Sequence, residues 1–470
     1  MDRPISRRAA LGVGVATGLG VAVAGGIGAL FNGSGGSGAA TGSGAASSYS
    51  RRGAGYGPLI SDPEGRLALP EGFRYRLLAE EGVSRLETGE PSPSEPDGAA
   101  VFARRGGSGS VLVCNHEIGS DDLHPVPHIE GLVYDPAGRG GVTLIEMDAD
   151  GAPIRHYVGL AGTYKNCSGG RTPWNTWLSC EETEKNDLGK LHGYVFEVDP
   201  FDEAANRDVR PVKALGRFPH EAVVVDPENE VLYLTEDARN PNGSVYRWTP
   251  PADALPLGKG TLRGLADDAG TLEALRATTE SGRHVADLSD ATSVGTTYRV
   301  QWVEVPERDA PGKSVRRQFE DDQVTRARKL EGMWWGDGGA YVVSSFARAE
   351  DGEAATHEGQ VWFLDPLAGT MRLHLLFAST KNPDANPNGP DNITVSPYGG
   401  VMIAEDGEGN PNLLGATPDG EVFVFAASEP KFEGSEFCGP VFSADQQTLF
   451  VNLMGPGVTF AVQGPFAQQA

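Results

Sequence analysis

A hairpin-like unit that recurs six times along the 470-residue chain limits the fold more than any other feature. Each unit has a polar or acidic start, an apolar run, a turn and a second apolar run that ends in acidic or amide residues. The units begin at Asp97, Cys167, Glu221, Glu331, Asp391 and Cys438, and end at Glu117, Glu182, Glu236, Ser345, Glu405 and Asn452. In five of the six, fourteen or fifteen residues separate the start from the end, which suits two strands of about five residues joined by a tight turn. We therefore expect a repetitive all-β structure.

Further strand-like runs lie between these units, at 193–200, 243–248 and 359–366. The unit spacing leaves room for four-stranded sheets, which need roughly 40–50 residues each. High glycine and proline contents, 64 and 33 residues, suit a fold rich in turns. We predict one all-β domain over residues 56–470, a six-bladed β-propeller, with two packed β-sandwich domains as the alternative.

The gap between the units that start at Glu221 and Glu331 is longer than the others. It predicts a small, partly helical insertion around residues 250–320. The run Thr271-Leu272-Glu273-Ala274-Leu275-Arg276-Ala277 has the composition of a helix, so we expect a helix there.

The N-terminus predicts export. Arg7 and Arg8 precede an uncharged run over 11–31 and a low-complexity tract over 32–50, an arrangement similar to a twin-arginine signal. A membrane anchor is the alternative, but the many glycines make a poor stable helix. We expect residues 1–55 to lie outside the fold, the protein to be periplasmic, cell-surface or extracellular, and no stable membrane insertion after signal removal.

The net charge of −25 argues against nucleic-acid partners, because phosphate backbones are bound by lysine and arginine surfaces. It fits an exported acidic surface or a protein that binds divalent cations. A closed propeller hides its strand edges, so we expect a monomer.

The chain has four cysteines: Cys114, Cys167, Cys180 and Cys438. In an exported protein two disulfides are one interpretation. The spacing does not match a zinc pattern of the C-x-x-C type. Cys167 starts one of the six units, which favours it as a metal ligand and leaves Cys180 for packing or a disulfide.

In a propeller one strand of each blade lines the central channel, so the start and end residues of the units are expected to converge on the axis. So many carboxylates would repel one another unless cations were bound. Hard oxygen donors suit calcium, and a thiolate favours a softer, redox-active ion such as iron. The predicted metal ligands are Cys167, Glu181, Glu182, Glu221, Glu236, Glu331, Asp391 and Glu405. For any single acid, the alternative is a turn cap at a solvated rim.

Several motifs resemble the PhoX-type alkaline phosphatases. They are Asn166-Cys167-Ser168-Gly169-Gly170 with Thr172-Pro173-Trp174 and Cys180-Glu181-Glu182, Gly216 to Ala222 (GRFPHEA), Lys329-Leu330-Glu331-Gly332, and Gly389-Pro390-Asp391-Asn392. The resemblance implies a six-bladed propeller exported by the twin-arginine route, whose axial site combines iron with calcium and hydrolyses phosphate esters. It implies that Cys167 binds iron, that Glu221 and Glu331 bind metal, and that Glu182 lies on the calcium side.

One position departs from the family pattern. Lys329 stands two residues before Glu331, where the resemblance leads us to expect an arginine that contacts phosphate. Lysine keeps the charge but not the bidentate fork of arginine.

The predicted reaction is metal-dependent hydrolysis of small phosphate esters, with Fe³⁺ and calcium as Lewis acids. Lys329 and Arg171 are candidates for balancing phosphoryl charge, and His220 for donating a proton or supporting the site. Two alternatives remain at this stage: a calcium-dependent propeller lactonase or esterase, and a non-catalytic binding propeller stiffened by calcium. Cys167 distinguishes them, since a calcium-only site has no need of a thiolate.

Overall fold

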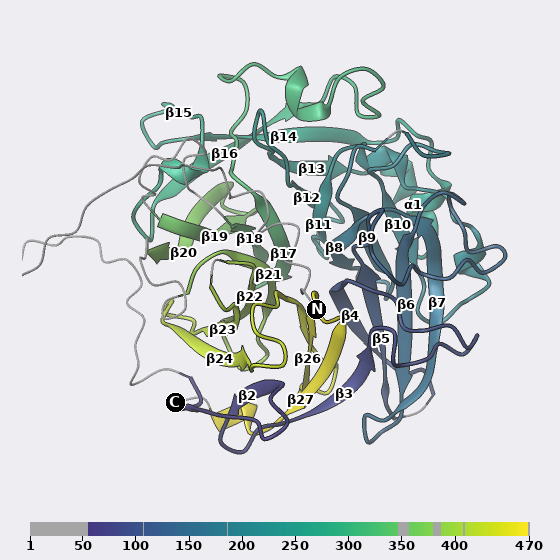
Figure 1. Ribbon diagram of the computed structural model, residues 1–470. Coiled ribbons are helices and arrows are strands. Elements are labelled where there is room, and N and C mark those ends of the chain that lie inside the picture. The colour runs from purple at the N-terminus through teal and green to yellow at the C-terminus, as the bar shows by residue number, and fades with distance from the viewer. Residues whose placement is uncertain are drawn as a thin grey trace, which may run out of the picture.

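The computed structural model describes residues 55–468, apart from 107, 186, 346–356, 379–386 and 408. The described residues form mostly antiparallel β-sheets arranged around a central axis, in the manner of a propeller (Figure 1). The predicted twin-arginine signal lies outside the described residues.

Hydrogen bonds divide the strands into five sheets. The first contains β4 (Pro96–Ala103), β5 (Ser110–His116), β6 (Gly140–Met147) and β7 (Pro153–Thr163). The second contains β8 (Asn166–Arg171), β9 (Trp177–Glu181) and β10 (Val195–Val198). The third has ten strands: β11 (His220–Val225), β12 (Leu232–Glu236), β13 (Val245–Thr249), β14 (Thr271–Thr278), β15 (His284–Val285), β16 (Thr297–Glu304), β17 (Leu330–Gly336), β18 (Gly339–Ser344), β19 (His357–Asp365) and β20 (Thr370–Ala378).

The last two sheets include strands from both ends of the described chain. The fourth contains β21 (Pro390–Val395), β22 (Val401–Glu405), β23 (Asn412–Ala416), β24 (Val422–Ser428), β2 (Leu67–Pro70) and β1 (Leu59–Ile60). The fifth contains β25 (Phe437–Phe442), β26 (Thr448–Leu453), β27 (Val458–Gln463) and β3 (Arg74–Glu80). Because β3 pairs with β27, and β2 with β24, the early chain closes the two sheets formed by the late chain.

The six predicted hairpins are all present, and their first strands surround the axis. These strands, β4, β8, β11, β17, β21 and β25, are called the inner strands below. Each contacts the next in this order, and β25 contacts β4. The inner strands therefore form a closed ring, visible at the centre of Figure 1.

The prediction of six separate blades is met only in part. Strand β14 pairs with β16 from Glu273↔Glu304 to Thr278↔Arg299, and β16 pairs in turn with β20. These pairings fuse the strands that follow β11 and those that follow β17 into one ten-stranded sheet.

The predicted helix over 271–277 is wrong, since these residues belong to strand β14. Leu272 and Ala274 are buried while Glu273 is less so, which is the alternation of a strand, and the run has sheet partners on both sides. Pairing with neighbouring strands outweighs the modest helix preference of Leu, Glu, Ala and Arg. The helical content of the described residues is limited to α1 (Thr261–Gly264) and the short 3-10 turns η2 (Ala205–Arg207), η3 (Lys213–Leu215), η4 (Ala252–Ala254), η5 (Leu288–Asp290), η6 (Val315–Gln318) and η8 (Phe466–Gln468).

The hydrophobic core lies between neighbouring sheets. One cluster joins Leu178 and Val195 of the second sheet to Val223, Leu234 and Trp248 of the third. Cys167 and Cys180 belong to this cluster. All four cysteines are buried and none forms a disulfide, so the two-disulfide interpretation is wrong.

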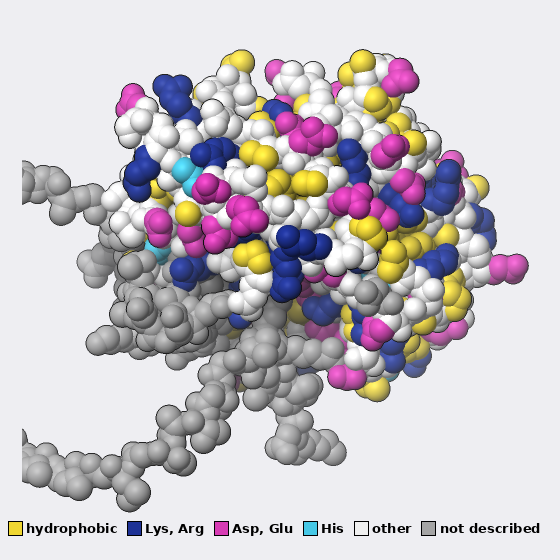
Figure 2. All heavy atoms as spheres, turned by 90° about the horizontal axis from the view of Figure 1, so that it is seen from above, with side chains coloured by type: hydrophobic (Ala, Val, Ile, Leu, Met, Phe, Trp, Pro, Cys, Tyr) yellow, Lys and Arg dark blue, Asp and Glu magenta, His cyan; other side chains and the backbone are white. Residues whose placement is uncertain are grey.

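The surface seen in Figure 2 looks onto the edge that carries β14 and the insertion. Acidic, basic and hydrophobic side chains are intermixed on this surface. No helix in the described part of the chain has both the length and the apolar character needed to cross a membrane.

Candidate metal centre at the propeller axis

The same backbone irregularity opens all six inner strands. Within the first five residues of each, the pairing register with the following strand shifts, which marks a β-bulge or similar irregularity. The second residues of the six strands are Asp97, Cys167, Glu221, Glu331, Asp391 and Cys438. Bulges redirect side chains and are common beside active sites. Every predicted unit start therefore occupies the same place on a bulged inner strand.

The residue that follows is small or short in every strand: Gly98, Ser168, Ala222, Gly332, Asn392 or Gly439. A Cβ atom on Gly98 would lie 2.8 Å from the carbonyl oxygen of Cys167, and one on Gly439 would lie 2.3 Å from that of Asp97. Side chains at these glycines would push neighbouring inner strands apart. Their absence lets the second residues of adjacent strands approach one another.

Three linked groups of possible metal ligands result. They are Cys167 with Glu182 and Glu221, then Glu221 with Glu331 and Asp391, then Asp391 with Asp406 and Glu436. Within each group, one ligand atom per residue lies within 4.8 Å of the others. Glu221 and Asp391 each belong to two groups, so the three groups form a continuous series.

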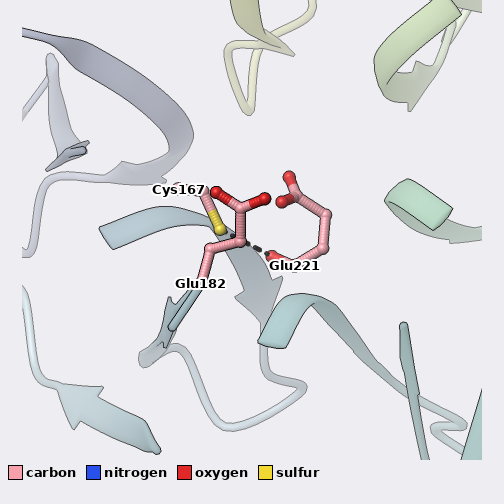
Figure 3. A group of neighbouring side chains, drawn as sticks. All are labelled: Cys167, Glu182 and Glu221. Atoms are coloured by element: carbon pink, nitrogen blue, oxygen red, sulfur yellow. Dashed lines mark hydrogen bonds between the residues drawn. The ribbon is translucent and has the colours of Figure 1, made fainter. Parts of the chain in front are cut away.

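The first group contains the thiol. In Figure 3 the carboxylates of Glu182 and Glu221 face one another, with the Cys167 sulfur beside them. The Cys167 Sγ donates to the backbone oxygens of His220 at 3.2 Å and Glu221 at 3.5 Å. Burial raises the pKa of this thiol well above its ordinary value, and the nearby Glu221 and Glu182 carboxylates raise it further. A thiol in such surroundings is ionised only when a cation is bound beside it.

Two lysines lie among these acids. The Nζ atom of Lys329 is 2.7 Å from Glu331 Oε1 and 3.5 Å from Asp406 Oδ2. The Nζ atom of Lys165 is 2.8 Å from Glu117 Oε1 and 3.5 Å from Glu182 Oε2. Each lysine immediately precedes an inner strand and has a left-handed backbone, with φ of 44° and 52°.

Lys165, Asp406 and Glu436 lie at the site but were not predicted from the sequence. A signal for two of them was present, because Lys165, Lys329 and Glu436 all stand two residues before the start of a unit. Asp406 directly follows the predicted ligand Glu405. Aligning the six units residue by residue, rather than only at their ends, would have drawn attention to these positions.

Three of the predicted ligands do not belong to any of the three groups. Glu181, Glu236 and Glu405 pair with the first residues of β8, β11 and β21. Successive side chains in a strand point to opposite faces, so Glu182 and Asp406, one residue later, join the groups instead.

Protein donors occupy the carboxylates of these three residues. Glu181 accepts from the backbone nitrogens of Tyr164 at 2.9 Å and Gly193 at 2.8 Å, and contacts His192 Nδ1 at 2.6 Å. Glu236 accepts from Tyr246 Oη at 2.6 Å and Arg316 Nη1 at 3.1 Å.

Glu405 accepts from the backbone nitrogens of Asn388 at 2.7 Å and Asn412 at 2.8 Å. Burial raises its pKa to about 7. These contacts indicate a structural role for Glu181, Glu236 and Glu405. They stabilise the ends of the strands that lie beside the three groups.

Of the three predicted catalytic residues, the structure brings only Lys329 to the groups. Arg171 is the last residue of β8, at the opposite end of the strand from Cys167. Its Nη2 donates to Asn175 Oδ1 at 3.2 Å, and its guanidinium lies 5.1 Å from the Phe102 ring centroid.

His220 is fully buried, and its Nε2 lies 3.1 Å from the Gly216 carbonyl oxygen. Its ring centroid is 3.7 Å from that of Phe218. Burial lowers the pKa of His220 to about 3. The imidazole is therefore neutral at ordinary pH, which favours support of the strand over proton donation from an imidazolium.

Comparison with known proteins gives one family. The family model for alkaline phosphatase PhoX matches residues 54–153 and 149–457. None of the curated proteins matches the sequence.

Solved structures that resemble the fold share little sequence with it. A gluconolactonase, XC5397 from Xanthomonas campestris, is 12% identical with a TM-score of 0.43, over 88% of this chain and 99% of that one. The β-propeller domain of Cps50 (Swd1) from Myceliophteria thermophila is 12% identical with a TM-score of 0.39, over 82% and 100%. The PQQ domain of pyranose dehydrogenase from Coprinopsis cinerea is 10% identical with a TM-score of 0.36, over 86% and 98%. At these scores the three structures do not bear on the activity of this chain.

Proposed function

The chain belongs to the alkaline phosphatase PhoX family, and from this premise we propose that it is a metal-dependent phosphatase that hydrolyses small phosphate esters at the axial groups. We propose iron and calcium as the bound ions. The main support is the series of three linked ligand groups, in which one buried thiol stands beside six carboxylates.

The donors in these groups fit the proposed ions. Carboxylate oxygens are the ligands that calcium prefers, and a thiolate suits iron. Cys167, Glu221, Glu331 and Asp391 are almost fully buried. A buried cluster of like charges is unfavourable without compensating cations, and Lys329 and Lys165 supply only two positive charges for six carboxylates. We assign the iron to the Cys167 group and calcium to the remaining carboxylates.

When bound, the ions supply positive charge that neutralises the phosphoryl oxygens during hydrolysis. The protein's own residues set the geometry. Glu221 and Asp391 each belong to two groups, so each would offer its carboxylate oxygens to two neighbouring ion positions. Lys329, between Glu331 and Asp406, holds a positive charge beside them and offers N–H donors to a phosphate oxygen. We do not assign Arg171 or His220 to this reaction, given where they lie.

We extend the proposal to the protein as a whole. The ten-stranded sheet is counted as two blades joined through β14 and β16, which makes six blades. The paired arginines Arg7 and Arg8 direct export through the twin-arginine route to the periplasm, cell surface or medium. The protein acts as a monomer.

Elemental analysis combined with hydrolysis of a generic aryl phosphate tests the function. The purified protein should contain iron and calcium, and should lose activity after chelation and regain it when the ions return. Cys167→Ala should lose both iron and activity. A wild-type protein without iron, together with an active Cys167→Ala variant, would contradict the proposal. Iron and calcium without phosphate-ester hydrolysis would point to another ester as substrate.

A further inference from the structure

We propose that Lys165 takes the place of one divalent cation at the edge of the metal centre. Its ammonium group holds together two carboxylates from different sheets, as a calcium ion would. The inference rests on the proposed metal centre, but not on the hydrolysis of phosphate esters.

The geometry is that of a carboxylate pair held by a cation. Glu117 follows β5 of the first sheet, and Glu182 follows β9 of the second. The side chains of these two acids are only 6% and 9% exposed, and Lys165 Nζ lies 2.8 Å and 3.5 Å from their oxygens. Carboxylates at this burial need a charged partner. Glu182 also belongs to the Cys167 group, so Lys165 adjoins the metal centre directly.

The equivalent backbone position of another hairpin carries an acid in place of the lysine. Glu436 precedes β25 as Lys165 precedes β8. The backbone oxygen of each accepts from the residue after the following strand, Met454 in one case and Glu182 in the other, at 3.0 Å and 2.9 Å. Glu436 joins Asp391 and Asp406 in a group that could hold a metal ion. The residue just before an inner strand thus supplies either a positive charge, as Lys165 does, or a carboxylate that could bind a metal ion, as Glu436 does.

Removing the lysine should therefore create a calcium site. Glu117 and Glu182 can offer up to about four oxygens, and water completes the six to eight that calcium requires. Lys165→Gln is expected to bind about one more calcium ion per chain than the wild type, and calcium should raise its melting temperature more steeply. Lys165→Arg keeps the charge and should behave as the wild type.

Lys259→Gln is the matched control. Lys259 Nζ lies 2.6 Å from Asp199 Oδ2, and this lysine is 33% exposed, as is Lys165. Its partner Asp199 lies outside the three groups and is similarly buried, at 4%. This variant should lose stability without any gain in bound calcium.

The measurements are the calcium count by elemental analysis after equilibrium dialysis and the melting temperature with and without calcium. Both are independent of activity. A wild type without phosphatase activity, whose Lys165→Gln variant gains the extra ion, would reject the phosphatase and keep this inference. The inference is overturned if Lys165→Gln matches Lys259→Gln in both measurements. Should Lys165→Gln fail to fold without calcium, folding on calcium addition supports the inference. Failure to fold in calcium as well overturns it. In the double variant Lys165→Gln/Glu117→Gln the extra ion should disappear, and its persistence would also overturn the inference.

Discussion

Strands β8 and β25 place a cysteine at the same position and surround it differently. Cys167 and Cys438 are each the second residue of a bulged inner strand and are fully buried. Each thiol donates to the backbone oxygen of the first residue of the next inner strand, His220 at 3.2 Å and Pro96 at 3.0 Å. Burial is the largest cause of a raised pKa in both. The two cysteines thus share their backbone placement and one hydrogen bond to the next inner strand.

The difference comes from the residue that follows the second strand of each hairpin. After β9 this residue is Glu182, whose carboxylate joins Cys167 and Glu221. After β26 it is the buried Met454, and Cys438 belongs to none of the groups found among the described residues. Carboxylates lie near both thiols, since, after burial, Asp97, Glu436 and Asp391 raise the pKa of Cys438. Of the two cysteines, only Cys167, whose hairpin ends in Glu182, belongs to a group of possible metal ligands in the described part of the chain.

The largest expected effect comes from changing the two cysteines separately. Cys167→Ser should lose iron and lower kcat/KM for an aryl phosphate about a thousandfold, or about 4 kcal/mol of transition-state stabilisation. Cys438→Ser should stay within about threefold of the wild type, because its hydroxyl can still donate to Pro96. Equal losses in the two variants would mean that the Glu182 carboxylate does not distinguish the sites.

The next test gives β25 the acid that β8 has. Met454→Glu introduces a carboxylate after β26, at the position that Glu182 occupies after β9. We expect a loss of about 3 kcal/mol in unfolding free energy without added metal, the cost of an uncompensated buried charge. Divalent cations should restore much of it.

Urea denaturation with and without calcium or zinc measures this effect. The variant Met454→Glu/Cys438→Ser separates the part of the rescue that needs the thiol. If cations give no rescue in either variant, a carboxylate at this position is not sufficient to build a site.

A smaller effect is expected from the acid that supports the β8 site. Glu181 pairs with the first residue of β8, and its counterpart in β26 is the apolar Leu453. Glu181→Gln should weaken iron binding about tenfold to a hundredfold, because supporting residues orient metal ligands. Competition with a chelator measures the affinity.

Glu197→Gln is the control for this variant. Glu197 is a buried acid on β10 of the same sheet, and it accepts from Trp174 Nε1 and Thr176 Oγ1. It should lower stability and leave iron affinity unchanged. Comparable loss of affinity in both variants would show a general weakening of the sheet rather than support of the site.

The sequence allowed the hairpins and their starting residues to be predicted because both are repeated, whereas the bulges were not predicted. Six polar starts at a regular spacing are hard to produce except by six equivalent strands around an axis, and all six fall on the second residue of an inner strand. The helix at 271–277 could not be excluded, since its residues favour helix locally and only the partners β13 and β16 make it a strand.

The candidate site was predicted less completely than the fold. Cys167, Glu182, Glu221, Glu331 and Asp391 are found together, but the pleat separates Glu405 from Asp406, and a sequence does not show which of two adjacent acids faces the axis. Arg171 was predicted to balance phosphoryl charge. It is close to Cys167 in the sequence, but the strand β8 places the two residues towards opposite ends.

The smallest expected effect is a pH dependence that concerns Cys438. Its pKa is raised in the folded protein, so the buried thiol contributes stability that is fully present below the ordinary thiol pKa. This stability is lost as the pH rises above that value, since the unfolded chain releases the proton first. The loss amounts to about 1.4 kcal/mol per pH unit for one thiol.

Cys438→Ser should therefore lose less unfolding free energy than the wild type between pH 8 and pH 10, by about 1.4 kcal/mol. Urea denaturation of both proteins measures this difference. In metal-loaded protein Cys167→Ser should not show this gain, because a metal-bound thiolate has already lost its proton. Parallel pH profiles for Cys438→Ser and the wild type would mean that the Cys438 thiol does not resist ionisation in the folded state.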